Sequence, residues 1–445
     1  MRFTFLHFAD CHLGYRQYGH KERFNDFARA FLDVIRRAID AQVDFVVLAG
    51  DLFQKRAIDA LTLNQAVHGL RMLQDAGIPC LAVEGNHELA YYHDTIGWME
   101  FLAQQDLLIL LNPDLRQDGE SRLRAYANKR GAYFDPLPGV RVYGLRYMGA
   151  STAKALEIYT QLLAQDPPRE QGIDYTIFVA HTGVEGVLPG HMGGLSHRQL
   201  APLRPFVDYL ALGHIHKPYE FGGWIYNPGS PETCSLDEVS WPERGYYLVQ
   251  VDTEKPRESE EPRHQAQLHA NRRRPFLRLH VKVDLAATPQ ALYDHCQEVI
   301  ARKARDHAQI IPQQPVVSLT LTGTLAFERS QLDMVRLRAL VEEHFSPLLV
   351  LAKNGAVSRD ISVDPSDRLN RQELERQVLT ELAEQRPLFQ GQGEAWAELA
   401  IQLKQMVAES KDVSPEAILD EFQGWLAQHP APEEQGAAQE EETTL

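Results

Sequence analysis

The sequence contains no long apolar run and no obvious targeting segment. None of its 445 residues falls in an uninterrupted stretch of about 18 apolar residues, the length that a membrane-spanning helix requires. The chain starts with Met1-Arg-Phe-Thr, without a charged leader and a small-residue cleavage site. We therefore expect neither a membrane protein nor a secreted one, and the predicted location is the cytoplasm.

Cysteine is scarce and scattered. The four cysteines, Cys11, Cys80, Cys234 and Cys296, form no CxxC pair. A disulfide framework and a closed structural zinc site both need cysteines at short, paired spacings. The sequence excludes these two classes, and we expect the four side chains to be plain buried thiols.

Acidic residues outnumber basic ones, and most of the excess lies in the C-terminal segment. The formal net charge is −16, which by itself argues against binding a polyanion. From Asp364 onward there are 18 Asp+Glu and 6 Lys+Arg, a net −12, which leaves about −4 for the preceding residues. The acidity belongs mainly to a C-terminal segment, so a nucleic-acid partner stays possible for the rest.

About 250 N-terminal residues alternate short apolar runs with helical patterns, which is typical of successive βα units. Helices are predicted over 26–41 and 61–76, where apolar residues recur at spacings of three and four. The predicted strands are 3–8, 45–49, 80–83, 107–111, 140–144, 176–180, 209–212, 224–226 and 246–251. An α/β domain over residues 1–253 is the result.

Three further regions follow the first domain. Residues 254–275 are polar and predicted to be a linker. Residues 276–363 are predicted to form a βαβαβ domain, with strands 276–283, 316–325 and 348–353 and helices 289–308 and 329–344. Residues 364–429 show only helical patterns, and residues 430–445 have too little to bury and are predicted to be disordered.

Five short polar motifs follow predicted strands. They are Asp10-Cys-His12, Gly50-Asp51, Gly85-Asn-His-Glu88, His181 and Gly213-His-Ile-His216. Open α/β sheets build their sites at the carboxyl ends of strands. In the DxH and HxH motifs, the period of two of an extended chain puts both side chains on one face. A single such residue is usually a turn or cap residue, but five in order favour a common site.

The donors in these motifs are carboxylate, imidazole and amide oxygen. This mixture suits divalent ions such as manganese, iron or zinc. Two such ions about 3.5 to 4 Å apart can share one carboxylate and hold both oxygens of an in-line phosphoryl displacement. The motifs therefore predict hydrolysis of a phosphate ester.

The ordered set DxH, GD, GNHE, H and GHxH resembles the calcineurin-like metallophosphoesterase superfamily. Within it, the DNA-repair nucleases of the SbcD type are similar in four segments. These are Asp10-Cys-His-Leu-Gly-Tyr15, Gly50-Asp-Leu-Phe53, Gly213-His-Ile-His216 and Asn227-Pro-Gly-Ser230. The resemblance covers residues 1–251 well and the βαβαβ segment only in layout. It implies a β-sandwich flanked by helices, a smaller α+β cap domain that contacts DNA, and a helical C-terminal tail.

The resemblance also implies a ligand set with two divalent ions, which we expect to be manganese. One ion would be held by Asp10, His12, Asp51 and His216. The other would be held by Asp51, Asn86, His181 and His214, so that Asp51 bridges them. His87 matches the family's catalytic histidine, which protonates the leaving oxygen or stabilises charge on the phosphate. Glu88 would orient His87 or face solvent.

One position departs from the family pattern. Many nucleases of this type have a second histidine three residues after the bridging Asp, where this chain has Gln54. Glutamine cannot titrate, which puts an additional acid–base role there in doubt. Lys55 and Arg56 follow directly and are candidates for contacts with the DNA backbone, although a solvated loop explains them equally.

A second basic cluster opens the predicted cap. Arg272, Arg273 and Arg274 form the strongest short basic run of the chain, and they are candidate phosphate contacts. A solvated linker is the alternative.

An SMC-like ABC ATPase of the SbcC type is the partner that the resemblance implies, and a homodimer is left open. Family nucleases dock on this ATPase through helices after the cap, and Trp396, Leu399 and Leu403 are the candidate contacts. A helix packed back on the cap is the alternative. The predicted function is a metal-dependent exonuclease or endonuclease that processes DNA ends in double-strand-break repair. A phosphatase or small-molecule phosphodiesterase of the same fold, or a DNA-binding scaffold with structural metals, are the competing readings.

Overall fold

The computed structural model describes residues 1–91, 95–115, 121–188, 194–257, 261–284, 286–358, 371–384, 391–409 and 415–428. The chain divides into two compact units, Met1–Val357 and Ser358–Leu445. The predicted disordered segment 430–445 lies outside the described residues. Within the described ranges, no helix combines the length and the apolar character needed to cross a membrane.

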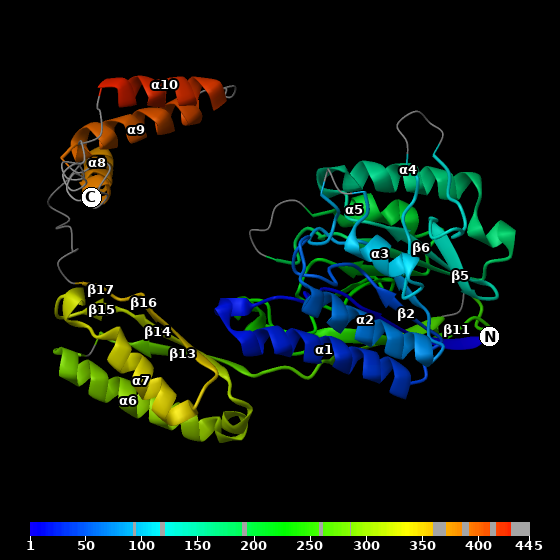
Figure 1. Ribbon diagram of the computed structural model, residues 1–445, viewed down its shortest axis with the longest axis horizontal. Helices are drawn as coiled ribbons and strands as arrows, with labels where there is room; N and C mark the ends of the chain where they lie inside the picture. The colour runs from blue at the N-terminus through cyan, green and yellow to red at the C-terminus, as the bar shows by residue number, and fades with distance from the viewer. Residues whose placement is uncertain are drawn as a thin grey trace, which may run out of the picture. The chain divides into compact units, whose positions relative to one another are not determined.

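Two six-stranded sheets form the core of the first unit (Figure 1). One sheet contains β1 (Arg2–Phe8), β2 (Phe45–Leu48), β3 (Cys80–Ala82), β4 (Ile109–Leu110), β11 (Gly245–Asp252) and β12 (His264–Ala270), in the order β12-β11-β1-β2-β3-β4. The other contains β5 (Tyr133–Leu137), β6 (Val140–Leu145), β7 (Tyr175–His181), β8 (Tyr209–Gly213), β9 (Tyr219–Phe221) and β10 (Ile225–Asn227), in the order β5-β6-β7-β8-β10-β9. Strands β1 to β4 pair in parallel, as do β6, β7 and β8.

The two sheets pack face to face through alternate residues of their strands. In β1, Phe3 and Phe5 belong to the core between the sheets, whereas Leu6 and Phe8 belong to the core under the helices. The ring of Phe5 meets Tyr209 of the other sheet edge-on, with centroids 5.1 Å apart. Because both faces of β1 are covered, its sequence is apolar on both sides. This two-sided burial fixes the register in which the strand ends present their polar residues.

Helices cover the outer face of each sheet (Figure 1). Helices α1 (Lys21–Asp40), α2 (Ala60–Asp75) and α3 (Trp98–Gln104) bury their apolar residues with the first sheet. Helices α4 (Thr152–Gln165) and α5 (His197–Leu200) do the same with the second. In α1, Phe31, Val34, Ile35 and Ala38 are fully buried at spacings of three and four. The predicted sandwich with helices on its outer faces is confirmed.

Strand β12 lies inside the segment that the sequence predicted to be a linker, 254–275. It pairs antiparallel with β11 along its whole length and forms the edge of the first sheet. Its sequence HQAQLHA carries small or apolar residues at every second position among polar ones, which is an edge-strand pattern. The overall polarity of the segment concealed that alternation.

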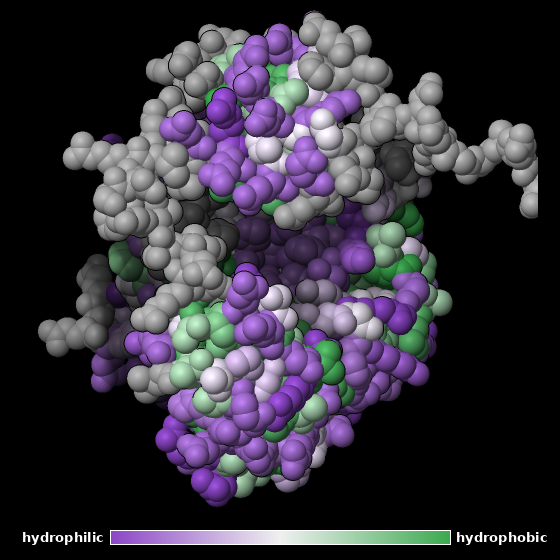
Figure 2. Space-filling view, turned by 90° about the vertical axis from the view of Figure 1, so that its left-hand side faces the viewer, coloured by the Kyte–Doolittle hydropathy of each residue, from purple (hydrophilic) through white to green (hydrophobic). Residues whose placement is uncertain are grey.

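The smaller α/β layer after β12 is the predicted cap. Strands β13 (Phe276–Lys282), β14 (Val316–Thr322) and β16 (Leu349–Asn354) form a parallel sheet, and a short pair is made by β15 (Thr324–Leu325) and β17 (Val357–Ser358). Helices α6 (Pro289–Asp306) and α7 (Met334–Phe345) connect the strands and share one apolar core with the sheet. The face of the cap in the lower part of Figure 2 shows many hydrophilic residues with hydrophobic ones among them. The long elements of this layer follow one another in the order β13, α6, β14, α7 and β16.

The described residues of the second unit form three helices, α8 (Arg371–Glu384), α9 (Gly393–Glu409) and α10 (Pro415–Gln428). Helices α8 and α9 pack against each other. Leu399 is buried, and Trp396 and Leu403 are half-buried. Val378 and Leu382 of α8 are exposed instead. The predicted docking stripe of α9 therefore contributes to the packing of its own helical unit.

Candidate metal centre

The polar residues that follow β1, β2, β3, β7 and β8 meet at one edge of the sandwich, because parallel strands bring their carboxyl ends together. Several of them have unusual backbones. The φ angles of Asp10, His12, Asp51 and His214 are 56°, 48°, 52° and 94°. Such left-handed conformations are unfavourable for residues with a Cβ atom and cluster at functional sites. The fold thus holds strained residues where the motifs predicted a site.

Glycine is required where the strand ends approach one another. Gly50 has a φ of 87°, and a Cβ atom there would lie 2.4 Å from Nδ1 of His181. A Cβ atom on Gly85 would lie 2.1 Å from Oδ1 of Asp51. Both positions exclude a side chain so that Asp51 and His181 can occupy the space.

Asp51 is the central residue of the cluster. Its Oδ2 atom lies 3.3 Å from Nε2 of His181, 4.0 Å from Nε2 of His12 and 4.0 Å from Nε2 of His87. Its Oδ1 atom accepts a hydrogen bond of 3.0 Å from the backbone N–H of His87. The side chain is 2% exposed. One buried carboxylate thus faces three imidazole rings from both sheets.

On one side of Asp51, three predicted ligands converge, and we call this the Asn86 side. Oδ1 of Asn86 lies 2.9 Å from Nδ1 of His214 and 3.1 Å from Nε2 of His181. The two ring nitrogens are 3.3 Å apart. The ligand atoms of Asp51, His181 and His214 all lie within 4.8 Å of one another, a spacing that can hold a metal ion.

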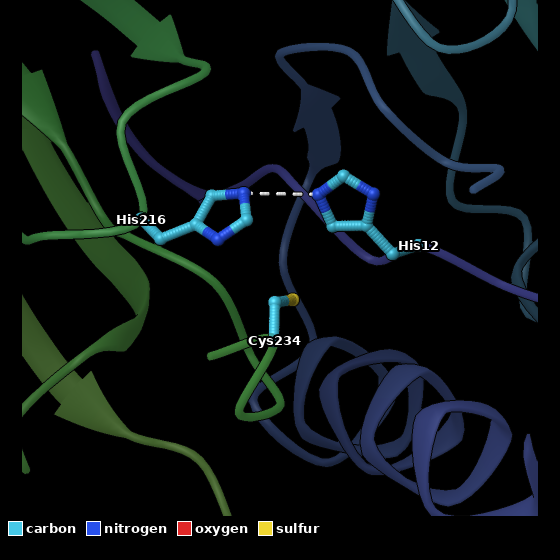
Figure 3. Close-up of side chains that lie close together, drawn as sticks. All are labelled: His12, His216 and Cys234. Atoms are coloured by element: carbon cyan, nitrogen blue, oxygen red, sulfur yellow. Dashed lines mark hydrogen bonds between the residues drawn. The ribbon is translucent and has the colours of Figure 1, made fainter. Parts of the chain in front are cut away.

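On the other side, Nε2 of His12 lies 3.0 Å from Nε2 of His216, and we call this the His216 side. Cys234 stands beside these two rings (Figure 3). The ligand atoms of His12, His216 and Cys234 all lie within 4.8 Å of one another. Cys234 is only partly buried, so the expectation of a plain buried thiol is wrong for this residue. It holds for Cys11, Cys80 and Cys296, which are buried.

Hydrogen bonds from the far side of two rings direct their other nitrogens into the site. Nδ1 of His181 donates to the carbonyl of Ala49 at 2.8 Å, and Nδ1 of His216 donates to the carboxylate of Glu238 at 2.8 Å. Each ring can therefore present an unprotonated Nε2, which is the form that binds metals. Together with the carboxylates and the Asn86 amide oxygen, these nitrogens fit divalent metal ions.

The motif Asn227-Pro-Gly-Ser230 supports His216, a role that its sequence did not reveal. The amide of Asn227 donates to the carbonyls of Ile215 and Lys217, at 2.6 and 2.8 Å. The hydroxyl of Ser230 donates to Glu238 at 3.0 Å. This network clamps the backbone on both sides of His216 and anchors the carboxylate that orients its ring.

Burial and neighbouring charges shift the pKa values of several residues in the centre. Burial raises the pKa of Asp10 to about 6, although nearby His216 and His181 oppose the shift. Burial also acts to raise the pKa of Asp51, but the charge and hydrogen bond of His181 outweigh it and hold that pKa below its usual value. The pKa of His181 rises to about 9, because Asp51 outweighs the effect of burial.

His87 differs from the other histidines in its exposure. Its side chain is 35% exposed, while His12 and His181 are almost fully buried. Its Nδ1 donates to the backbone carbonyl of Gln54 at 2.7 Å, which directs Nε2 toward Asp51. Any residue at position 54 supplies that carbonyl, so the glutamine does not disturb this contact.

Glu88 is buried and does not face solvent. Its carboxylate accepts backbone hydrogen bonds from Gly85 at 2.9 Å and Phe53 at 3.1 Å. Burial raises its pKa to about 8. Glu88 therefore joins the loops that carry Asp51 and Asn86. Tyr147 is a further neighbour that the sequence did not signal, and its ring centroid lies 5.6 Å from that of His214.

The two predicted basic clusters have different surroundings. Lys55 and Arg56 are exposed, and Lys55 lines a cavity of about 400 Å³ together with Arg16 and Gln54. In the second cluster only Arg272 is exposed.

The other two arginines of the second cluster bond to the protein. Arg274 binds Asp26 of α1 through contacts of 2.7 and 3.0 Å, and Arg273 donates to the carbonyl of Arg244 at 2.7 Å. These two side chains join the sandwich to the start of the cap.

The N-terminal part of the chain is similar to known proteins. The family model of the calcineurin-like phosphoesterases matches residues 3–218. The DNA double-strand break repair protein Mre11 of Archaeoglobus fulgidus is 33% identical over 247 residues, which cover 53% of this chain and 52% of that protein. The Mre11 proteins of Saccharolobus solfataricus and Haloferax volcanii are 28% and 32% identical, over 56% and 55% of this chain.

The likeness does not extend over the whole of these relatives. The matched segments cover 61% of the Saccharolobus solfataricus protein and 48% of the Haloferax volcanii protein. This chain thus aligns with about half to three-fifths of each relative.

Proposed function

We propose that this chain, whose residues 3–218 match the family model of the calcineurin-like phosphoesterases, is a metal-dependent nuclease that processes DNA ends in double-strand-break repair. The observation that carries the proposal is the position of Asp51, a buried carboxylate that faces His181 on one side and His12 on the other. Relatives named as DNA double-strand break repair proteins support DNA as the substrate.

The proposed ligands divide into two sets that share Asp51. Asp10, His12 and His216 complete the first set, and Asn86, His181 and His214 complete the second. When bound, two divalent ions would activate water and stabilise charge on the phosphate as the ester bond breaks. We propose manganese as the activating ion, since oxygen and imidazole donors suit it.

The chain's own contribution to the reaction centres on His87. Its Nδ1 is occupied by the Gln54 carbonyl, so Nε2 is the atom available to a substrate. A protonated Nε2 would donate to the leaving oxygen or to a non-bridging phosphate oxygen. The partial exposure of this ring is compatible with access to a polymer that enters from solvent.

Exposed basic residues are proposed to hold the DNA backbone. Lys55 and Arg56 directly follow the loop that carries Asp51, and Arg272 is the exposed member of the second cluster. Such contacts position the duplex without reading its sequence. The affinity for DNA should therefore fall as salt increases.

The proposal includes a cytoplasmic location and an SMC-like ATPase of the SbcC type as partner. Exposed apolar residues on the helical unit support a docking role, namely Val378 and Leu382 of α8. Leu399, by contrast, is 4% exposed. Exposed apolar anchors are the side chains that a partner usually buries.

A matched pair of substitutions tests the docking role. Leu382→Glu should weaken binding to the ATPase about tenfold or more and leave the helicity of the chain unchanged. Leu399→Glu should lower the helicity, because it buries a charge. If Leu382→Glu binds the partner normally in a pull-down, α8 is not the docking surface.

A nuclease assay tests the function itself. The purified chain is incubated with end-labelled duplex and single-stranded DNA in the presence of manganese, alongside nitrophenyl phosphate. We expect DNA cleavage that a chelator abolishes. Hydrolysis of nitrophenyl phosphate without DNA cleavage would indicate a phosphatase, and DNA binding without hydrolysis would indicate a scaffold.

A further inference from the structure

We propose that Cys234 is a thiolate ligand of the ion held by His12 and His216. This inference rests on the metal-dependent function proposed above and adds a sulfur donor to a set that otherwise contains only nitrogen and oxygen. Three ligand atoms lie within 4.8 Å of one another there, Nε2 of each ring and Sγ of Cys234. In Figure 3 the thiol lies beside the gap between the two rings.

The spacing of the three atoms suits one ion. Zinc–nitrogen bonds of about 2.0 Å and zinc–sulfur bonds of about 2.3 Å place the donors of a tetrahedral site about 3.5 Å apart. The two ring nitrogens, 3.0 Å apart, lie about 0.5 Å closer than this spacing, so a small outward movement of the rings would admit the ion. A small rotation about the Cα–Cβ bond of Cys234 changes the position of Sγ without moving the backbone.

The structure anchors the backbone of Cys234 and one ring through the same carboxylate. Glu238, which is 2% exposed, accepts hydrogen bonds from Nδ1 of His216 at 2.8 Å and from the backbone N–H of Cys234 at 2.9 Å. Arg244 lies 3.4 Å from the same carboxylate. One buried, paired carboxylate thus holds the His216 ring and the backbone of Cys234 close to each other, as outer-shell groups do when they orient ligands.

Without an ion, the protein offers the thiol two partners, the ring of His216 and a backbone carbonyl. The Sγ atom of Cys234 lies 3.8 Å from the carbonyl of Glu232, a long contact for a weak donor. Among the described residues, Cys234 is the cysteine that belongs to a cluster with ligand spacing, whereas Cys11, Cys80 and Cys296 are buried outside such clusters.

A thiolate would make the two metal positions chemically different. On binding, the thiol releases its proton to water and forms a sulfur–metal bond, with no change in oxidation state. Thiolate is a soft donor that favours zinc and cobalt over magnesium and manganese. The His216 side should therefore bind a softer ion more tightly than the Asn86 side does.

Cobalt absorption tests the proposal independently of activity. The full chain is stripped with a chelator and loaded with Co²⁺, and the near-ultraviolet sulfur-to-cobalt charge-transfer band is recorded. We expect the band in the wild type and in Cys296→Ala, a control that removes a buried thiol from the cap. Cys234→Ala should lose the band.

The measured cobalt content distinguishes a failure of the thiolate proposal from a failure of the proposed function. If cobalt binds to the wild type but no charge-transfer band appears, or if the band survives in Cys234→Ala, the thiolate ligand is refuted and the metal-dependent function stands. If no cobalt binds at all, both proposals fail. Zinc affinity provides a second readout, because Cys234→Ser, which conserves size, should lose about tenfold or more. Unchanged zinc affinity would also overturn the proposal.

Discussion

The two sides of the centre are built differently, although they share Asp51. On the Asn86 side, the ligands stand at the ends of β3, β7 and β8, and their polar atoms lie 2.9 to 3.3 Å from one another. On the His216 side, the ring of His216 is oriented by Glu238, from the segment that also carries Cys234. Both sides are carried by strand ends, but the ring of His216 depends in addition on the segment that carries Glu238.

This difference indicates that substitutions in the Glu238 segment can change one metal position and leave the other unchanged. A ligand at a strand end is held by the hydrogen bonds of the sheet and by a core packed on both faces. A ligand oriented by a loop depends on a few side chains, here Glu238 and the residues that bond to it. The His216 side is therefore the part of the centre that single substitutions should alter most selectively.

The largest effect is expected where the two sides meet. Asp51→Ala removes the carboxylate that faces both, so hydrolysis should fall by more than about 10³-fold. Both ions should be lost or weakened, while the fold persists. Metal content and turnover measured on the same sample check this. A variant that keeps two ions and normal turnover would show that Asp51 is no bridge.

The next effect should appear without loss of metal. His87→Ala removes the proposed proton donor, so turnover should fall by about 10²- to 10⁴-fold with metal content nearly intact. His87 lies 4.0 Å from Asp51, close enough that it could also be a ligand. Loss of an ion together with activity would assign it to that role instead.

A smaller and one-sided effect is expected from the loop. Glu238→Gln weakens the orientation of His216, so affinity for one of the two ions should fall about 10- to 100-fold while the other is unchanged. Glu232→Gln is the matched control, because Glu232 is also a buried carboxylate but binds Arg23. Two-step metal titrations should separate the variants. An equal loss of affinity for both ions in Glu238→Gln would contradict the distinction between the two sides.

Much of this centre could be predicted from the sequence because its ligands follow strands in regular motifs. The apolar runs of β1, β2, β7 and β8 mark the strands, and the polar residues directly after them converge by the geometry of parallel sheets. Asp51 and His181 are brought together in this way. The local sequence and the tertiary structure agree at these residues. The pattern of strands and the motifs were therefore sufficient to predict that the side chains converge.

The remaining features depend on contacts between segments that are distant in sequence. Cys234 reaches His12 across more than two hundred residues, and no local spacing signals it. The side chains of Arg273 and Arg274 look like a DNA-binding run, but the fold gives them partners in Arg244 and Asp26. The alternation in β12 was concealed by polar residues, which an edge strand tolerates on its solvent side.

Anomalous diffraction from manganese-soaked crystals tests the central claim most directly. The account predicts two anomalous peaks about 3.5 to 4 Å apart, with the carboxylate of Asp51 between them. One peak should lie against Asn86, His181 and His214, and the other against His12 and His216. A single peak, or two peaks that do not share Asp51, would contradict the two-metal centre proposed for this chain.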